Sequence, residues 1–142
     1  MANKIDTAID AVLAAFTARM VDGVRVFKNC KTELVNPMES EVLCPYVAMV
    51  LGGVPHVGGP AAARQWNAEL LIEVVAVSKS SQADATISEL IANAEYVLDH
   101  LGSIGAVVEM PKWAVQHNLT PSRTFVWATG TADVRIMGPL LT

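Results

Sequence analysis

Three histidines are the side chains in this sequence best suited to accept a proton in catalysis. They are His56, His100 and His117, and they lie far apart in segments of different kinds. None has a Cys, Ser or Asp beside it in the arrangement of a catalytic set. His100 falls near the end of a predicted helix, where the helix dipole favours a cation. We therefore expect no enzymatic activity, and His56 or His117 with Glu69 is the candidate pair for an alternative small hydrolase or ligand-binding domain.

Glu69 and Glu73 are the carboxylates that could work as an acid and base pair. They lie four residues apart on a predicted strand, which separates them by about 13 Å. Paired catalytic carboxyl groups are closer, at roughly 5 to 9.5 Å. We therefore expect the two side chains to form a solvated or interface stripe along the strand rather than a catalytic pair.

The residues that commonly hold metals or phosphates do not form a recognisable site. Cys30 and Cys44 lack the paired spacing of a zinc site and are too few for a disulfide framework, so we interpret them as reduced thiols. The glycine pairs at 52–53 and 58–59 match neither a dinucleotide fingerprint nor a phosphate-binding loop. The sequence predicts no metal and no cofactor.

The composition indicates one domain that does not bind nucleic acid. The chain has 142 residues, of which 52% are hydrophobic, and a formal net charge of −4. One core of ordinary size accounts for this length, so we expect residues 1–142 to form a single domain. The densest basic run, formed by Arg25, Lys28 and Lys31, has no interleaved aromatic side chains. It is more typical of a solvated surface than of a phosphate-binding patch.

Two apolar segments need to be distinguished from membrane or export signals. Residues 42–63 carry no charge, but seven Gly and Pro residues interrupt them, and irregular backbone cannot face lipid. Residues 5–20 are interrupted by Asp6, Asp10 and Arg19. We expect no membrane segment and synthesis in the cytosol.

Residues 66–77 contain the clearest secondary-structure pattern. Their even positions are all apolar, whereas Asn67, Glu69 and Glu73 occupy odd positions. This period of two predicts a strand with one buried face.

Two other segments have the three- and four-residue apolar repeat of an amphipathic helix. The first covers residues 5–20 and is stopped by Gly23. The second follows the main strand and runs to Leu101, with Ser81 as the predicted N-cap and Gly102 as the C-cap. The change of period after residue 77 predicts that this helix folds back on the sheet.

The remaining pattern predicts an α+β fold. Further strands are expected at residues 24–27, 43–51, 106–110 and 124–136, with irregular connections at 29–40, 52–64 and 111–122. The predicted order is α-β-β-β-α-β-β. We expect a mixed, mainly antiparallel sheet with two helices packed on one face.

Two features of these elements indicate contact with a neighbour. The connection that starts at Gly52 and Gly53 and ends at Arg64 has few residues to hold it locally, so we expect it to be mobile in a free subunit and ordered by a neighbouring one. In the last strand, Phe125 and Trp127 fall on the polar face by alternation. Exposed aromatic side chains on a sheet favour a protein interface.

The order of elements and three strand sequences resemble a known family. These sequences are VRVFK at residues 24–28, LCPYVAMV at 43–50 and LLIEVVAV at 70–77. Together with the two helices and the closing strand, they look like the tail terminator and tail completion proteins of long-tailed bacteriophages. The resemblance spans nearly the whole chain and consists of element order and patterning rather than an invariant motif. The segments at 52–64 and 111–122 depart from it.

The resemblance implies a structural protein of the virion tail that is assembled in the host cytoplasm. Members of the family form a ring, generally a hexamer, on the last disc of the tail tube. The ring stops polymerisation of the tube protein and offers a surface to the head–tail connector, with DNA only passing through its channel. In such a ring, Glu69 and Glu73 are expected to line either a seam between subunits, paired with Arg64 or Arg135, or the channel, where acidic walls repel DNA phosphates. A head–tail connector or neck subunit is the alternative within the virion, and the small hydrolase or ligand-binding domain is the alternative outside it.

Overall fold

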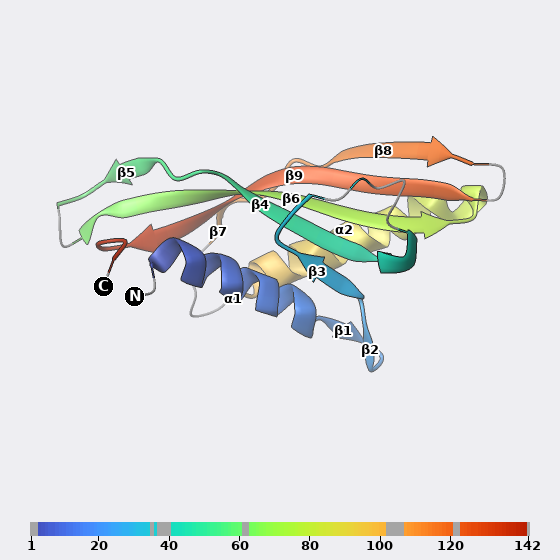
Figure 1. Ribbon diagram of the computed structural model, residues 1–142, viewed down its shortest axis with the longest axis horizontal. Helices are drawn as coiled ribbons and strands as arrows, with labels where there is room; N and C mark the ends of the chain where they lie inside the picture. Colours follow the sequence, from blue (N-terminus) through green and yellow to red (C-terminus); the bar gives the residue numbers. More distant parts are fainter. Residues whose placement is uncertain are drawn as a thin grey trace.

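The structure is a computed structural model that describes residues 3–34, 36, 41–60, 63–101, 107–120 and 123–141. Figure 1 shows a long, twisted sheet with both helices, α1 (Lys4–Ala18) and α2 (Ala83–Asp99), below it. Both helices contribute side chains to one core with the sheet. The sheet is mainly antiparallel, with one parallel pair. The predicted α+β fold class is confirmed.

Two long strands form the centre of the sheet. They are β6 (Gln65–Ser78) and β9 (Thr124–Met137), which pair antiparallel along their whole length. Their even-numbered apolar side chains lie on the face covered by the helices, which we call the inner face, and most are fully buried there. Their odd-numbered side chains lie on the opposite, outer face. The alternation in the sequence therefore predicted both strands and their buried side correctly.

Helix α1 begins at a side-chain cap and buries one stripe. The Asn3 side chain accepts a hydrogen bond from the Asp6 backbone N–H at 2.8 Å. Val12 and Phe16 are fully buried against the inner face. The helix ends at Ala18, so its predicted extension to residue 20 is wrong.

A short hairpin follows α1. Strands β1 (Met20–Val21) and β2 (Val24–Arg25) pair antiparallel, and the turn between them uses positive φ values of 52° at Asp22 and 79° at Gly23. Gly23 thus makes a hairpin turn, for which its lack of a Cβ is suited, rather than ending the helix. The predicted strand at residues 24–27 is shortened to two residues.

Helix α2 packs on β6 and β9 through the predicted repeat, and its buried side chains include Ile87, Leu90, Ala94, Val97 and Leu98. The predicted N-cap is wrong: a 3-10 turn, η4 (Ser80–Gln82), precedes the helix and puts Gln82 at the cap position, without a side-chain cap hydrogen bond. The helix ends at Asp99 with His100 as C-cap. Gly102, the predicted C-cap, lies outside the described residues.

Neither α1 nor α2 combines the length and the hydrophobicity that a membrane-spanning helix needs, and the described residues contain no other candidate.

Strand β4 (Tyr46–Gly53) lies between β6 and an edge strand that the sequence did not reveal. This edge strand, β3 (Asn29–Lys31), pairs parallel with β4 and falls in the segment that was predicted to be a connection. Three residues are too few to show an alternation of polarity. Pro45 lies directly before β4, after the short 3-10 helix η2 (Glu41–Leu43). It therefore does not interrupt the ladder of hydrogen bonds.

The glycine-rich segment at residues 52–64 is more regular than predicted. Gly52 and Gly53 are the last residues of β4, and a further strand, β5 (His56–Gly58), pairs with the start of β6. Arg64 lies just before β6, and its carbonyl accepts a hydrogen bond from the Gly138 N–H at 2.7 Å. The segment therefore extends the sheet beyond β4, although its sequence has no alternating pattern.

Two short strands share the far edge of β9. They are β7 (Val107–Glu109), as predicted, and β8 (Ala114–Leu119), in a segment that was predicted to be irregular. All six residues of β8 are exposed, so no buried face generates an alternation in its sequence. Between the two strands the chain crosses β9 at Gly130, where an added Cβ would lie 2.6 Å from Pro111 Cβ.

Gly130→Val should lower the free energy of unfolding by about 1–3 kcal/mol, because the new side chain collides with the crossing segment and forces it to shift. Denaturant unfolding of the purified chain measures this effect. Thr131→Val, at the exposed neighbouring position, is the control and should change stability by less than about 0.5 kcal/mol. Equal stability of the two variants would show that the segment at residues 111–113 does not press on β9.

Candidate functional site

The three histidines make contacts with three different partners. The His56 ring lies 4.9 Å from the ring of Trp66. His117 Nε2 lies 3.0 Å from the Asp84 carboxylate at the start of α2. His100 stacks on Tyr96 with 4.0 Å between ring centroids. The histidines therefore belong to separate parts of the surface.

The candidate hydrolase pairs are not formed. His56 lies opposite Trp66 on β6. Trp66 is three residues from Glu69, so it lies about 10 Å away along the strand and on the opposite face of the sheet. His117 lies opposite Val126 on β9, and Val126 pairs with Ala76 on β6. Ala76 is seven residues from Glu69, which is about 23 Å along the strand. Among the described residues, no group of three or more His, Cys, Asp or Glu side chains could hold a metal ion.

Carboxylates from three neighbouring strands gather on the outer face. Glu69 on β6 lies directly opposite Asp133 on β9, and Asp133 in turn pairs with Glu109 on β7. All three line a hollow of about 570 Å³, together with Lys112. Burial raises the pKa of Asp133, and the charges of Glu69 and Glu109 raise it further. We call Glu69, Glu109 and Asp133 the acidic row.

Only one member of the acidic row was a candidate from the sequence. Asp133 occupies an odd position of β9 and so falls on the outer face by alternation. Nothing local indicates that it lies opposite Glu69, because strand register is set by pairing between distant segments. Arg135 lies opposite Asn67, and no ion pair joins Arg64 or Arg135 to Glu69 or Glu73 among the described residues of one subunit. The predicted pairing across a seam between subunits stays a prediction.

The Glu69 side chain occupies the space where a side chain at residue 53 would lie. The two residues are partners across β4 and β6. A Cβ at residue 53 would lie 2.6 Å from Glu69 Oε1, whereas one at Gly52 would lie 3.4 Å from the Glu69 carbonyl oxygen. The two candidate glycines thus help to shape the outer face rather than a phosphate site.

Glu73 lies further along the same face and is half-buried between Ala48 and Thr129. The Thr129 hydroxyl lies 3.4 Å from Glu73 Oε2, a long hydrogen bond, while Oε1 is buried without a partner among the described residues. Burial raises the pKa of this carboxyl, and the Thr129 hydrogen bond partly offsets the rise. Glu73 is therefore a destabilising group when it is ionised in the isolated chain.

Glu73→Gln should increase the free energy of unfolding at pH 7 by the order of 1 kcal/mol. The folded-state pKa is raised, so the carboxyl favours the folded state below its unfolded pKa and loses that contribution as the pH rises through the folded pKa. The gain should therefore vanish near pH 3.5. Urea unfolding at both pH values measures it, with Glu89→Gln on the exposed side of α2 as the control. A gain of the same size at both pH values would contradict this account.

Phe125 and Trp127 are not the exposed pair that alternation predicted. Phe125 is only 3% exposed. Trp127 is half-buried and packs on an outer-face cluster that contains Tyr46 and Val75. The segment at η2 lies over this end of the outer face, where Leu43 packs against the same cluster as Trp127. The prediction that both aromatic side chains are exposed is therefore wrong, whereas the predicted interface role stays a prediction.

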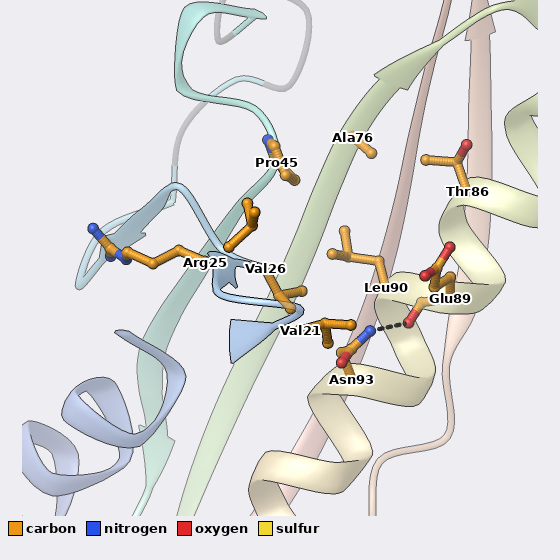
Figure 2. A pocket seen from close by; sticks show the side chains of 10 residues that line it. Val21, Arg25, Val26, Pro45, Ala76, Thr86, Glu89, Leu90 and Asn93 are labelled. Carbon is orange, nitrogen blue, oxygen red and sulfur yellow. Dashed lines mark hydrogen bonds between the residues drawn. The ribbon is translucent and has the colours of Figure 1, made fainter. Parts of the chain in front are cut away.

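An apolar groove opens between the β1–β2 hairpin and α2 (Figure 2). It has a volume of about 240 Å³ and is lined mainly by the hairpin, Pro45, Ala76 and one side of α2. Asn93 is held at its floor because its side-chain amide donates to the Glu89 carbonyl at 3.0 Å and its oxygen accepts from Arg19 Nε at 2.9 Å. No Ser, Cys or His is among the described residues that line the groove.

Exposed apolar side chains lie on the β1–β2 hairpin, which is a separate two-stranded sheet, and on the edge strand β8 of the main sheet. The hairpin that leads to β3 exposes Met20, Val21 and Val24. Strand β8 exposes Val115 and Leu119. Edge strands are usually protected by charges or proline, and β8 contains neither.

Comparison with known proteins does not place the chain in a family. No protein-family model matches the sequence, and no curated protein matches it. The candidate site is therefore described by its own geometry: an acidic row on the outer face, and two different exposed edges.

Proposed function

We propose that this protein is a subunit of a ring that closes the end of a bacteriophage tail tube, stops polymerisation of the tube protein and offers the joining surface for the head. The ring, expected to be a hexamer, would act without a cofactor as a structural part of the virion. The proposal combines the resemblance to tail terminator proteins with the surfaces described above.

The observation that carries the proposal is the presence of two unlike exposed apolar surfaces, on the β1–β2 hairpin and on strand β8. The two elements lie apart in the fold (Figure 1). Head-to-tail association needs two different patches on each subunit, and it closes into a ring if the rotation between subunits allows. The hairpin with Met20, Val21 and Val24 supplies one patch, and the unprotected strand β8 supplies the other. The inner face is already occupied by α1 and α2, so contacts between subunits fall on the edges and the outer face.

Sedimentation velocity and negative-stain electron microscopy of the purified protein test the proposal. We expect a discrete oligomer that appears as closed rings with a central hole, and the same protein at one end of purified tails. A monomer at high concentration, together with absence from purified tails, would contradict the proposal. An open filament would contradict closure.

Reversing the charge of both candidate glutamates, Glu69→Lys with Glu73→Lys, distinguishes two positions for them in the ring. If they line the channel, tails should end at normal length while DNA delivery falls, because cationic walls retain the phosphate backbone. If they lie at a seam between subunits, rings should fail to form and tails should grow too long. Tail length by electron microscopy and infectivity are the measurements. Normal values for both would leave the carboxylates as plain solvated surface.

A further inference from the structure

We propose that the seam between neighbouring subunits is formed by opposite charges: the acidic row of one copy receives the basic segment Arg25, Lys28 and Lys31 of the next copy. This inference rests on the proposed ring and specifies which two surfaces meet in it. The occupant of the hollow between β6, β9 and β7 is thus a second copy of this chain.

The basic segment is available for such a contact. Arg25 and Lys28 are exposed and Lys31 is half-buried. No described residue forms an ion pair with any of them. Figure 2 shows the Arg25 side chain extending away from α2 and out of the groove. Three positive charges therefore project from the segment that leads into and forms the edge strand β3.

The acidic row carries more negative than positive charge among the described residues that line the hollow. Like charges on directly opposite strand positions destabilise a sheet, and the row places three carboxylates side by side. Lys112 is the one cationic side chain that lines the described hollow. Burial is the main cause of the raised pKa of Asp133, and the charges of Glu69 and Glu109 add to it. A cationic partner that enters the hollow would remove this cost, whereas a nucleic acid would increase it.

The two surfaces cannot meet within one subunit. The sheet order is β3-β4-β6-β9-β7, so the basic segment lies at one edge and the acidic row extends to the other. Neighbouring strands are about 4.8 Å apart, which separates β3 from β7 by about 19 Å. The hairpin that carries Arg25 also exposes apolar side chains, whereas Val115 and Leu119 of β8 pair with β9 residues that are five and nine positions away from Asp133. Complementary charges are well suited to fix the register of a contact.

A charge-swap experiment tests the seam with two variants of the full chain. The acid-reversed variant carries Glu69→Lys and Glu109→Lys, which flank Asp133 with cations and should leave the single subunit at least as stable as before. The base-reversed variant carries Arg25→Glu and Lys28→Glu. Each variant alone would bring like charges together at every seam, so we expect self-association to weaken by about tenfold or more.

Mixing the two variants in equal amounts should restore association to nearly the wild-type level. In an alternating ring, each hollow then faces a segment of opposite charge. Lys79→Glu with Asp99→Lys, at exposed positions away from both surfaces, is the control and should associate like the wild type. Sedimentation velocity measures all four samples.

Zero-length carbodiimide cross-linking of the wild type gives a second measurement that does not depend on variants. In a mixture of isotope-labelled and unlabelled chains, we expect mass spectrometry to find mixed-label cross-links between Lys28 and Glu109 or Asp133. Wild-type rings without these cross-links, or rings of both variants that form normally, would overturn the seam and leave the proposed ring in place. A wild-type chain that stays monomeric at high concentration and is absent from purified tails would overturn both.

Discussion

Phe16→Ala should lower the free energy of unfolding by about 3–5 kcal/mol, one of the two largest effects expected for this chain. Phe16 is fully buried, and its ring meets that of Phe27 edge-on, with 5.1 Å between centroids and an angle of 76°. Edge-to-face pairs contribute about 0.5–1.5 kcal/mol beyond the area they bury. The pair joins α1 to the chain that leads into β3, so its loss should loosen both elements.

Denaturant unfolding followed by circular dichroism measures this effect. Val24→Ala is the control, because Val24 belongs to the neighbouring hairpin but is 68% exposed. The control should change stability by less than about 0.5 kcal/mol. If Phe16→Ala were as mild as its control, α1 would not be docked on the inner face as described.

Phe125→Ala should likewise cost about 3–5 kcal/mol in the isolated subunit, because the side chain is buried at the end of β9. The interpretation from the sequence predicts the reverse, with little effect on the subunit and a strong effect on association. Measuring both the unfolding free energy and the oligomeric state separates the two interpretations.

Leu119→Ala is the matched control for Phe125→Ala. Leu119 lies on the neighbouring strand β8 and is 70% exposed, so its truncation should leave the stability of the subunit nearly unchanged. If Leu119 belongs to the contact between subunits, its loss should weaken association instead. A stable Phe125→Ala subunit with impaired association would restore the interface role of this aromatic residue.

Several parts of the fold followed from local pattern. The alternation at residues 66–77 and 124–136 predicted β6, β9 and their buried faces, and the helical repeats predicted α1 and α2. Each of these elements has one face in the core, so its apolar residues recur with a period of two in a strand or about 3.6 in a helix. The sequences of strands β3, β5 and β8 show no such alternation, because each strand has at most six residues and β8 is exposed throughout.

Helix boundaries were less predictable than helix positions. Met20 continues the apolar repeat of α1 but begins a hairpin, and Ser81 is a good capping residue that lies inside a 3-10 turn. In both cases the chain direction is decided by where the next element must lie. A repeat of apolar residues carries no information about that position.

The sequence by itself determined the secondary structure of the four longest elements, the face that each buries and the placement of Glu69 and Glu73 on the outer side of β6. Only the tertiary structure decided that Glu69 lies beside Asp133 and Glu109, and that Phe125 is covered. The physical reason is that periodicity reports the burial of each segment separately, whereas register and coverage depend on pairing between segments distant in the chain, which leaves no local signal.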